Sequence, residues 1–161
     1  MQELHRFGYS GAVDADGHVL EPPDIWERYI DPRDRDLALR IIPDEDGLEF
    51  LDLGGTPSRI IRRGYPAGLG LMDRLAGFVY EREPTGSTYR DTAPLGAMDP
   101  QERIERLDRE NIDRAILYPT VGVLWVAELE AEKRIPANLR AYNRWISEWC
   151  SDGDGRQVPI A

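Results

Sequence analysis

The sequence predicts an α/β fold with a parallel sheet, because three apolar, strand-like runs alternate with helical segments along the chain. The strand-like runs span residues 9–16, 115–119 and 158–161, and the helical segments span residues 99–110, 124–133 and 136–150. Parallel neighbours are joined by crossover connections that usually contain a helix, so this order predicts a βαβαβ unit. The third strand only begins as the 161 residues end, and we therefore expect the sequence to be the N-terminal part of a longer domain.

The first predicted strand carries two candidate metal ligands, Asp16 and His18, toward its C-terminal end. Alternate residues on a strand face the same way, so the carboxylate and the imidazole should project together. Both groups bind divalent metals such as Zn²⁺ and Mn²⁺. The same spacing also fits an edge strand whose Asp and His are only solvated or hydrogen-bonded. Because the chain has two histidines, any further ligands must be carboxylates or lie outside this sequence.

A short helix and then an insertion of about residues 31–97 follow this strand. Asp24 is placed to cap the short helix, in which we expect Trp26 to pack rather than to bind a substrate. The insertion contains two apolar runs on either side of a glycine-containing turn, which predict a β-hairpin flap extended by a third short run. These three runs span residues 37–42, 48–53 and 58–61.

Residues 62–95 have no clear periodicity and predict a long loop, with a helical turn at 71–78. Loops of this length are commonly either binding lids or poorly ordered segments, and both alternatives stay open.

The second half of the chain has stronger local signals. Asp99, Pro100 and Glu102 form a helix-start pattern for the segment that ends at Asn111. The apolar run at 115–119 is typical of a strand covered on both faces. The last helix is expected to bury one stripe of side chains, namely Leu139, Tyr142, Ile146, Trp149 and Cys150.

Composition excludes several classes of protein. The net charge of −10 repels phosphate backbones, so we expect no nucleic-acid partner. No apolar run approaches the roughly 20 residues of a membrane-spanning helix, and no signal peptide is recognised, which predicts a cytoplasmic protein with no membrane partner. The single cysteine, Cys150, excludes an intramolecular disulfide, and its place on an apolar helix face predicts a buried thiol.

Three segments together resemble the amidohydrolase-related metal-dependent hydrolases and decarboxylases, in particular the branch that contains aminocarboxymuconate semialdehyde decarboxylase. The segments are residues 13–22 with Trp26, residues 106–120, and residues 141–145. The resemblance implies the N-terminal part of a (β/α)₈ TIM barrel, with its first two to three βα units. Residues 1–161 would then form one incomplete barrel domain that carries the flap and the long loop as an insertion.

The resemblance also implies a function. Asp16 and His18 match the metal-binding pair of the family's first strand, although many members have His or Glu where this chain has Asp16. The expected cofactor is a divalent metal, Zn²⁺ in the first place and Mn²⁺ as the alternative. The expected activity is hydrolysis or decarboxylation of a small carboxylate or cyclic substrate. The family's other metal ligands and its catalytic histidine come from later strands, so no catalytic or cofactor-binding residue is assigned and the isolated chain is expected to be inactive. A homodimer is an open alternative.

Three further residues have two interpretations each. Glu21 is either a carboxylate near the metal site that acts as an acid, a base or a support, or the cap of a helix entry. Asn143 is expected to make a buried structural hydrogen bond, with substrate contact as the alternative, and Thr120 is a weak candidate for lining a pocket. The alternative for the whole chain is a non-catalytic α/β module that binds a partner through residues 62–95.

Overall fold

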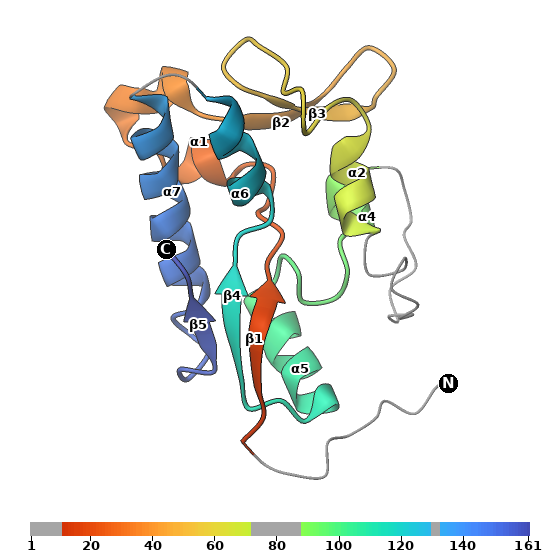
Figure 1. Cartoon of the computed structure of the whole chain (residues 1–161), viewed down its shortest axis with the longest axis vertical. Helices are drawn as coiled ribbons and strands as arrows, with labels where there is room; N and C mark the ends of the chain where they lie inside the picture. Colours follow the sequence, from red (N-terminus) through yellow and green to blue (C-terminus); the bar gives the residue numbers. More distant parts are fainter. Residues whose placement is uncertain (1–10, 72–87, 130–132) are drawn as a thin grey trace.

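A computed structural model describes residues 11–71, 88–129 and 133–161 of the chain (Figure 1). Its main sheet has three parallel strands in the order β1 (Val13–His18), β4 (Arg114–Tyr118) and β5 (Gln157–Pro159). The predicted parallel sheet is therefore confirmed, with the apolar run at 115–119 as its central strand. The first strand lies later in the sequence than the predicted 9–16, so that it includes His18 as its last residue.

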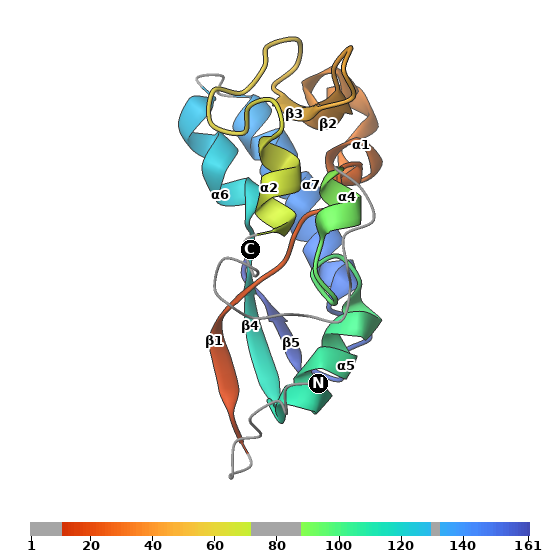
Figure 2. The same cartoon turned by 90° about the vertical axis from the view of Figure 1, so that its right-hand side faces the viewer.

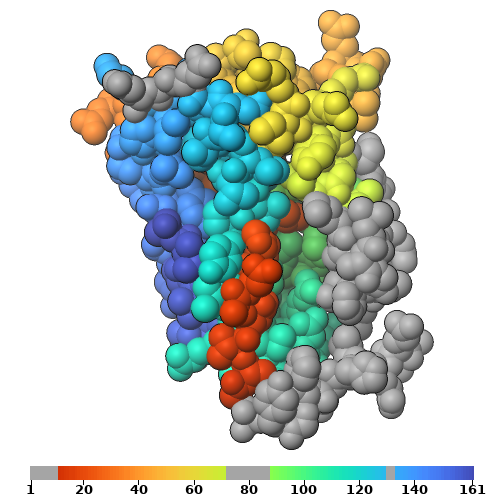
Figure 3. Space-filling model, in the orientation of Figure 1, coloured from red at the N-terminus to blue at the C-terminus, as the bar shows by residue number. Residues whose placement is uncertain are grey.

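Helices cover one face of this sheet. α5 (Pro100–Glu110) and α7 (Arg134–Trp149) lie on the same side of the strands (Figure 2). The opposite face shows atoms of β1, β4 and β5 (Figure 3). In β4, Ala115 and Leu117 are fully buried whereas Ile116 and Tyr118 are only half-buried. The prediction of a strand covered on both faces is therefore wrong for the described chain, because its second face has no covering layer there.

The signals at the ends of α5 act as predicted. The Asp99 carboxylate accepts the N–H groups of Gln101 and Glu102, both at 2.9 Å, and Asn111 ends the helix with a left-handed φ of 57°. The Glu102 carboxylate accepts the N–H of Gly96 at 3.1 Å. This bond ties the start of the helix to the preceding loop.

The buried face of α7 differs from the predicted stripe. Tyr142, Ile146, Trp149 and Cys150 are buried as expected, and burial raises the pKa of the Cys150 thiol to about 11. Leu139, however, is 37% exposed, because the face that packs on the core passes through Ala137, Asn138, Ala141 and Trp145.

The buried amide on this helix is Asn138, which is fully buried. Its side chain donates to the Leu37 carbonyl oxygen at 2.9 Å and accepts the Leu39 N–H at 3.1 Å. The buried hydrogen bonds expected of Asn143 are thus made by Asn138, which lies earlier on the same helix. Asn143 itself is half-buried.

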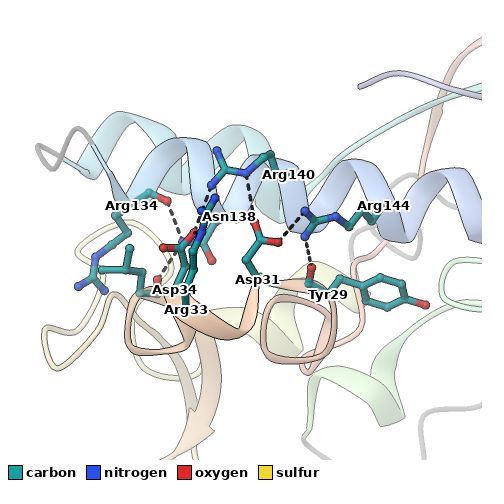
Figure 4. Close-up of polar contacts among 9 residues, drawn as sticks. Tyr29, Asp31, Arg33, Asp34, Arg134, Asn138, Arg140 and Arg144 are labelled. Atoms are coloured by element: carbon teal, nitrogen blue, oxygen red, sulfur yellow. Dashed lines mark hydrogen bonds and ion pairs between the residues drawn. The ribbon is translucent and has the colours of Figure 1, made fainter.

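The short helix α1 (Ile25–Tyr29) precedes the insertion, which begins with the 3₁₀ helix η1 (Pro32–Leu37). Trp26 is fully buried, as expected for a packing residue. Figure 4 shows that arginines of α7 hold the start of η1. Arg144 contacts the Asp31 carboxylate at 3.0 Å and donates to the Tyr29 carbonyl oxygen at 2.7 Å, while Arg140 contacts Asp31 at 3.5 Å.

The predicted hairpin is confirmed. β2 (Arg40–Pro43) and β3 (Glu49–Asp52) pair antiparallel, and we call residues 40–64 the flap. The run at 58–61 is not a strand, since its neighbourhood contributes only an isolated bridge between Asp52 and Pro57. The flap is followed by α2 (Tyr65–Gly70) and, later, by α4 (Tyr89–Thr92).

Residues 72–87 of the predicted loop at 62–95 lie outside the described residues, and the described remainder contains the short helices α2 and α4, which the sequence does not predict. The helical turn expected at 71–78 lies outside the described residues except for Leu71, which ends α2. The helical pair expected from residue 124 begins earlier than predicted, with α6 (Val121–Trp125) and the 3₁₀ helix η2 (Val126–Glu128). Residues 130–132 also lie outside the described part. None of the helices in the described ranges is long and apolar enough to cross a membrane.

Candidate metal centre

The strand that carries the candidate ligands contains a β-bulge. Asp14 pairs with Ala115 and Gly17 pairs with Leu117, so β1 has one residue more than β4 over this step. A Cβ on Gly17 would lie 2.9 Å from an Asp14 carboxylate oxygen and 3.1 Å from the Leu117 side chain. Asp14 therefore occupies the space beside Gly17, on the Leu117 side, and does not continue the alternation with Asp16 and His18.

Asp16 and His18 themselves are both exposed in the C-terminal half of β1. His18 pairs in register with Tyr118, and the centroids of the two rings lie 5.9 Å apart. Within the described residues, no group of three or more His, Cys, Asp and Glu side chains is close enough to hold a metal ion. The described chain thus offers two donors at one strand end, which is fewer than the three or four protein ligands of typical zinc sites.

The His18 ring has a defined orientation. Its Nδ1 lies 3.0 Å from the Pro119 carbonyl oxygen and 3.2 Å from the Thr120 hydroxyl. A carbonyl oxygen only accepts hydrogen bonds, so Nδ1 carries a proton, and in the neutral ring Nε2 keeps its lone pair. Metal-binding histidines typically donate their other ring N–H to a backbone carbonyl or carboxylate in this way. Thr120, a weak candidate from the sequence, therefore lies at the site and contacts the ring.

The backbone of His18 is held from the helix behind it. The Arg103 guanidinium is buried and donates to the His18 carbonyl oxygen and, at 2.7 Å, to the Gly96 carbonyl oxygen. The sequence pattern gives Arg103 no role and misses this contact. A signal for it is nevertheless present, because Arg103 lies four residues before Leu107 and so shares the apolar side of the helix.

Glu21 lies three residues beyond His18 and is fully buried. Its carboxylate accepts the N–H groups of Thr120 at 3.3 Å, Val121 at 2.9 Å and Gly122 at 2.8 Å. Burial raises the pKa of Glu21, and the three backbone hydrogen bonds act in the opposite direction. Glu21 therefore caps α6, whereas the sequence suggests a cap of the helix entry next to Pro22.

A glycine at position 122 makes this cap possible. A Cβ there would lie 3.0 Å from a Glu21 carboxylate oxygen and 2.8 Å from the Pro119 side chain. The loops after β1 and β4 are thus locked together by contacts between residues about one hundred positions apart in the sequence.

Comparison with known proteins supports the fold. Neither a protein-family model nor a curated protein matches the chain. Among solved structures, an amidohydrolase from Mycobacterium avium subsp. paratuberculosis K-10 matches with a TM-score of 0.66 and 20% sequence identity. The match covers 96% of this chain and 42% of that chain, so the present chain spans less than half the length of the solved protein. The mixed α/β chain with its parallel sheet thus has the fold of a part of an amidohydrolase, whose complete fold is a TIM barrel.

Proposed function

We propose that this chain supplies the first βα units of a metal-dependent TIM-barrel hydrolase or decarboxylase of the amidohydrolase-related type. The observation that carries the proposal is the orientation of His18, whose Nδ1 is bound to the Pro119 carbonyl oxygen so that Nε2 is available to a metal. His18 also lies at the C-terminal end of β1, the end at which TIM-barrel enzymes have their active sites. The sequence resemblance to the decarboxylase-containing branch favours a small carboxylate or cyclic substrate.

The proposal includes residues beyond this sequence. The chain corresponds to 42% of the solved amidohydrolase, and its described part brings two candidate metal donors to the sheet end. The remaining ligands and the catalytic histidine would come from later strands, which would also cover the open face of the sheet. The 161 residues by themselves would then be inactive.

The roles of this chain's residues follow from the geometry. His18 would present Nε2 and Asp16 a carboxylate oxygen, while Pro119 and Thr120 keep the imidazole ring in place. A divalent metal bound there, with Zn²⁺ preferred and Mn²⁺ as the alternative, would supply Lewis-acid polarisation of a substrate oxygen or activation of water. Arg103 would keep the strand end fixed by holding the His18 carbonyl oxygen.

The test is the metal content and metal affinity of the full-length protein. We expect Asp16→Asn and His18→Ala each to weaken Zn²⁺ binding, since each removes one donor. Asp14→Asn is the matched control, because this aspartate lies beside Gly17 on the Leu117 side and its Oδ1 accepts the Asp16 N–H at 3.0 Å, a bond that asparagine can keep. His5→Ala controls for loss of the other histidine. Unchanged Zn²⁺ affinity in Asp16→Asn and His18→Ala would refute the site and favour the binding-module alternative.

A second measurement separates the two reactions. Release of CO₂ from carboxylated aromatic or cyclic substrates would identify a decarboxylase, and turnover of amide or ester substrates without CO₂ release would identify a hydrolase. Either activity should disappear in His18→Ala and persist in Asp14→Asn.

A further inference from the structure

Hydrogen bonds from a buried carboxylate and from the ring of His18 meet at the same turn after β4. The ring contacts the Pro119 carbonyl oxygen at 3.0 Å and the Thr120 hydroxyl at 3.2 Å. The backbone of the same turn is held from its other side by Glu21, which accepts the N–H groups that begin with that of Thr120. Both sides of the turn are therefore fixed by residues from the end of β1.

Glu21 acts on this turn and has no route to a substrate. Its side chain is fully buried and uses both carboxylate oxygens for backbone N–H groups, Oε1 for Gly122 and Oε2 for Thr120 and Val121. An acid or base that touches substrate needs an accessible oxygen, which Glu21 lacks. Its carboxylate can, however, fix the positions of the Pro119 carbonyl and the Thr120 hydroxyl.

We infer that Glu21 is a positioning residue for His18. By fixing the N–H groups of residues 120–122, it places the Pro119 carbonyl oxygen so that the imidazole keeps its proton on Nδ1 and leaves Nε2 with a lone pair. The role of Nε2 as a metal ligand rests on the proposed function, but the ring tautomer does not depend on it. Glu21 would thereby tune the metal site without touching the metal.

Glu128 of η2, which binds the flap, provides a control carboxylate. The side chain of Glu128 is 4% exposed and accepts the N–H of Arg59 at 2.6 Å, the N–H of Ile60 at 3.2 Å and the hydroxyl of Ser58. It resembles Glu21 in accepting backbone N–H groups, but it is half-buried as a residue, and its partners belong to the flap and not to the turn after β4. A structural loss from Glu128→Gln should therefore leave His18 unaffected.

The experiment compares Glu21→Gln and Glu128→Gln in the whole chain, labelled with ¹⁵N-histidine. The chain has two histidines, and His18→Ala assigns the second imidazole. Spectra are taken at about pH 8, above the ordinary imidazole pKa of about 6.5. In the unmodified chain we expect His18 to show a protonated Nδ1. In Glu21→Gln the new amide N–H₂ group faces backbone N–H donors, so the turn shifts and the Nε2–H tautomer gains population.

Metal affinity gives an independent readout. Loss of a hydrogen-bonded group that supports a ligating histidine typically weakens metal binding by about 10–100-fold. In the full-length protein we expect a Zn²⁺ affinity loss of this size for Glu21→Gln and no loss for Glu128→Gln. Thr120→Val should shift the tautomer in the same direction, and its effect should not add to that of Glu21→Gln, because both act through one turn.

Failure of the Glu21 inference and failure of the proposed function would give different results. A His18 tautomer in Glu21→Gln that equals that in Glu128→Gln would overturn the inference, whatever the metal does. Unchanged metal affinity in His18→Ala would overturn the proposed function, while the tautomer comparison would still decide the role of Glu21. Should Glu21→Gln not fold, Glu21→Asp replaces it. This variant keeps the charge but is one methylene shorter, and an unchanged tautomer in folded Glu21→Asp would also refute the inference.

Discussion

Glu21 is fully buried and Glu128 is half-buried, and both carboxylates accept backbone N–H groups, yet their pKa values move in opposite directions. At Glu21, at the end of the parallel sheet, burial is the largest influence and raises the pKa despite three backbone hydrogen bonds. At Glu128 in η2, burial also raises the pKa, but the hydrogen bonds from Ser58, Arg59 and Ile60, together with the charge of Arg59, outweigh it and lower the pKa.

This difference separates two ways of fixing a loop. The sheet end is fixed inside the core, where Val121 and Gly122 are buried and water cannot replace the carboxylate. The flap is fixed at the surface, where Arg59 and Ile60 are exposed and a charge contributes to the attachment. The candidate metal ligand His18 thus lies where the loops are held by buried contacts, whereas the flap is held at the surface with the help of a charge.

The largest expected effect is the loss of the Glu21 carboxylate. Glu21→Ala leaves two buried N–H groups and one half-buried N–H group without an acceptor, and an orphaned buried donor costs about 1–3 kcal/mol. We expect the free energy of unfolding to fall by about 3–5 kcal/mol, measured by urea unfolding. Glu128→Ala should cost only about 1 kcal/mol, because water can reach the exposed flap backbone. Equal losses in the two variants would contradict the distinction between core and surface attachment.

Two glycines, one in β1 and one in the flap turn, extend the comparison between the sheet end and the flap. A Cβ on Gly17 would lie 3.0 Å from the Ile116 carbonyl oxygen as well as close to Asp14 and Leu117, so Gly17→Ala must push β1 away from β4. Overpacking of this kind costs about 2 kcal/mol, and the shift should also weaken Zn²⁺ binding at His18.

A Cβ on Gly47, in the flap turn, would meet no atom within 4 Å, but this residue has a φ of 81°. Gly47→Ala should cost about 1 kcal/mol from backbone strain alone, with Zn²⁺ binding unchanged. Calorimetry of both variants measures the losses of stability, and metal titration measures their Zn²⁺ affinities.

The pH dependence of unfolding should show opposite slopes for the two carboxylates. The folded-state pKa of Glu128 lies below its ordinary value of 4.5, so its stabilising contribution is present above about pH 4.5 and is lost as the pH falls through the folded-state pKa. The folded-state pKa of Glu21 lies above 4.5, so its contribution becomes less favourable as the pH rises from 4.5 through that pKa.

The measurement is the unfolding free energy of the wild-type chain, Glu21→Gln and Glu128→Gln between about pH 3 and 8. The loss caused by Glu128→Gln should shrink as the pH falls below 4.5, whereas the loss caused by Glu21→Gln should grow as the pH falls toward 4.5. Parallel pH profiles for the two variants would contradict the opposite pKa directions.

The same contrast explains what the sequence could and could not predict. Local signals were sufficient for the cap formed by Asp99, for the end of α5 at Asn111 and for the hairpin turn at Gly47, because each depends on neighbouring residues. The order of strands and helices was also readable, since the apolar periodicity repeats within each element.

Contacts between distant residues were not predictable in the same way. The partner of Glu21 lies about one hundred residues away, so nothing near Glu21 indicated which helix it caps. The bulge in β1 depends on how Gly17 fits against Leu117, and alternation along the strand does not predict it. The candidate pair Asp16 and His18 was found from its spacing, but the orientation of the imidazole required the loop after β4.

The smallest expected effect concerns the joint between the insertion and α7. A hydrogen bond from Arg144, and the charges of Arg144, Arg33 and Arg140, lower the pKa of Asp31. These groups are partly exposed, and exposed ion pairs contribute little and are screened by salt. Asp31→Asn should therefore lower the melting temperature less than any variant above.

Salt should affect the stability contributed by this joint but not that contributed by the sheet end. At about 1 M NaCl the Debye length is about 3 Å, so the difference between Asp31→Asn and the wild-type chain should disappear, whereas the loss in Glu21→Ala should persist. Lowering the pH should have the same effect as salt on the Asp31 pair, because its contribution is lost as the pH falls through the lowered pKa of Asp31. Thermal unfolding at about 0.1 M and about 1 M NaCl tests this. A salt-independent loss in Asp31→Asn would mean that the insertion, like the loops around Glu21, is attached by packed and desolvated contacts rather than by charge.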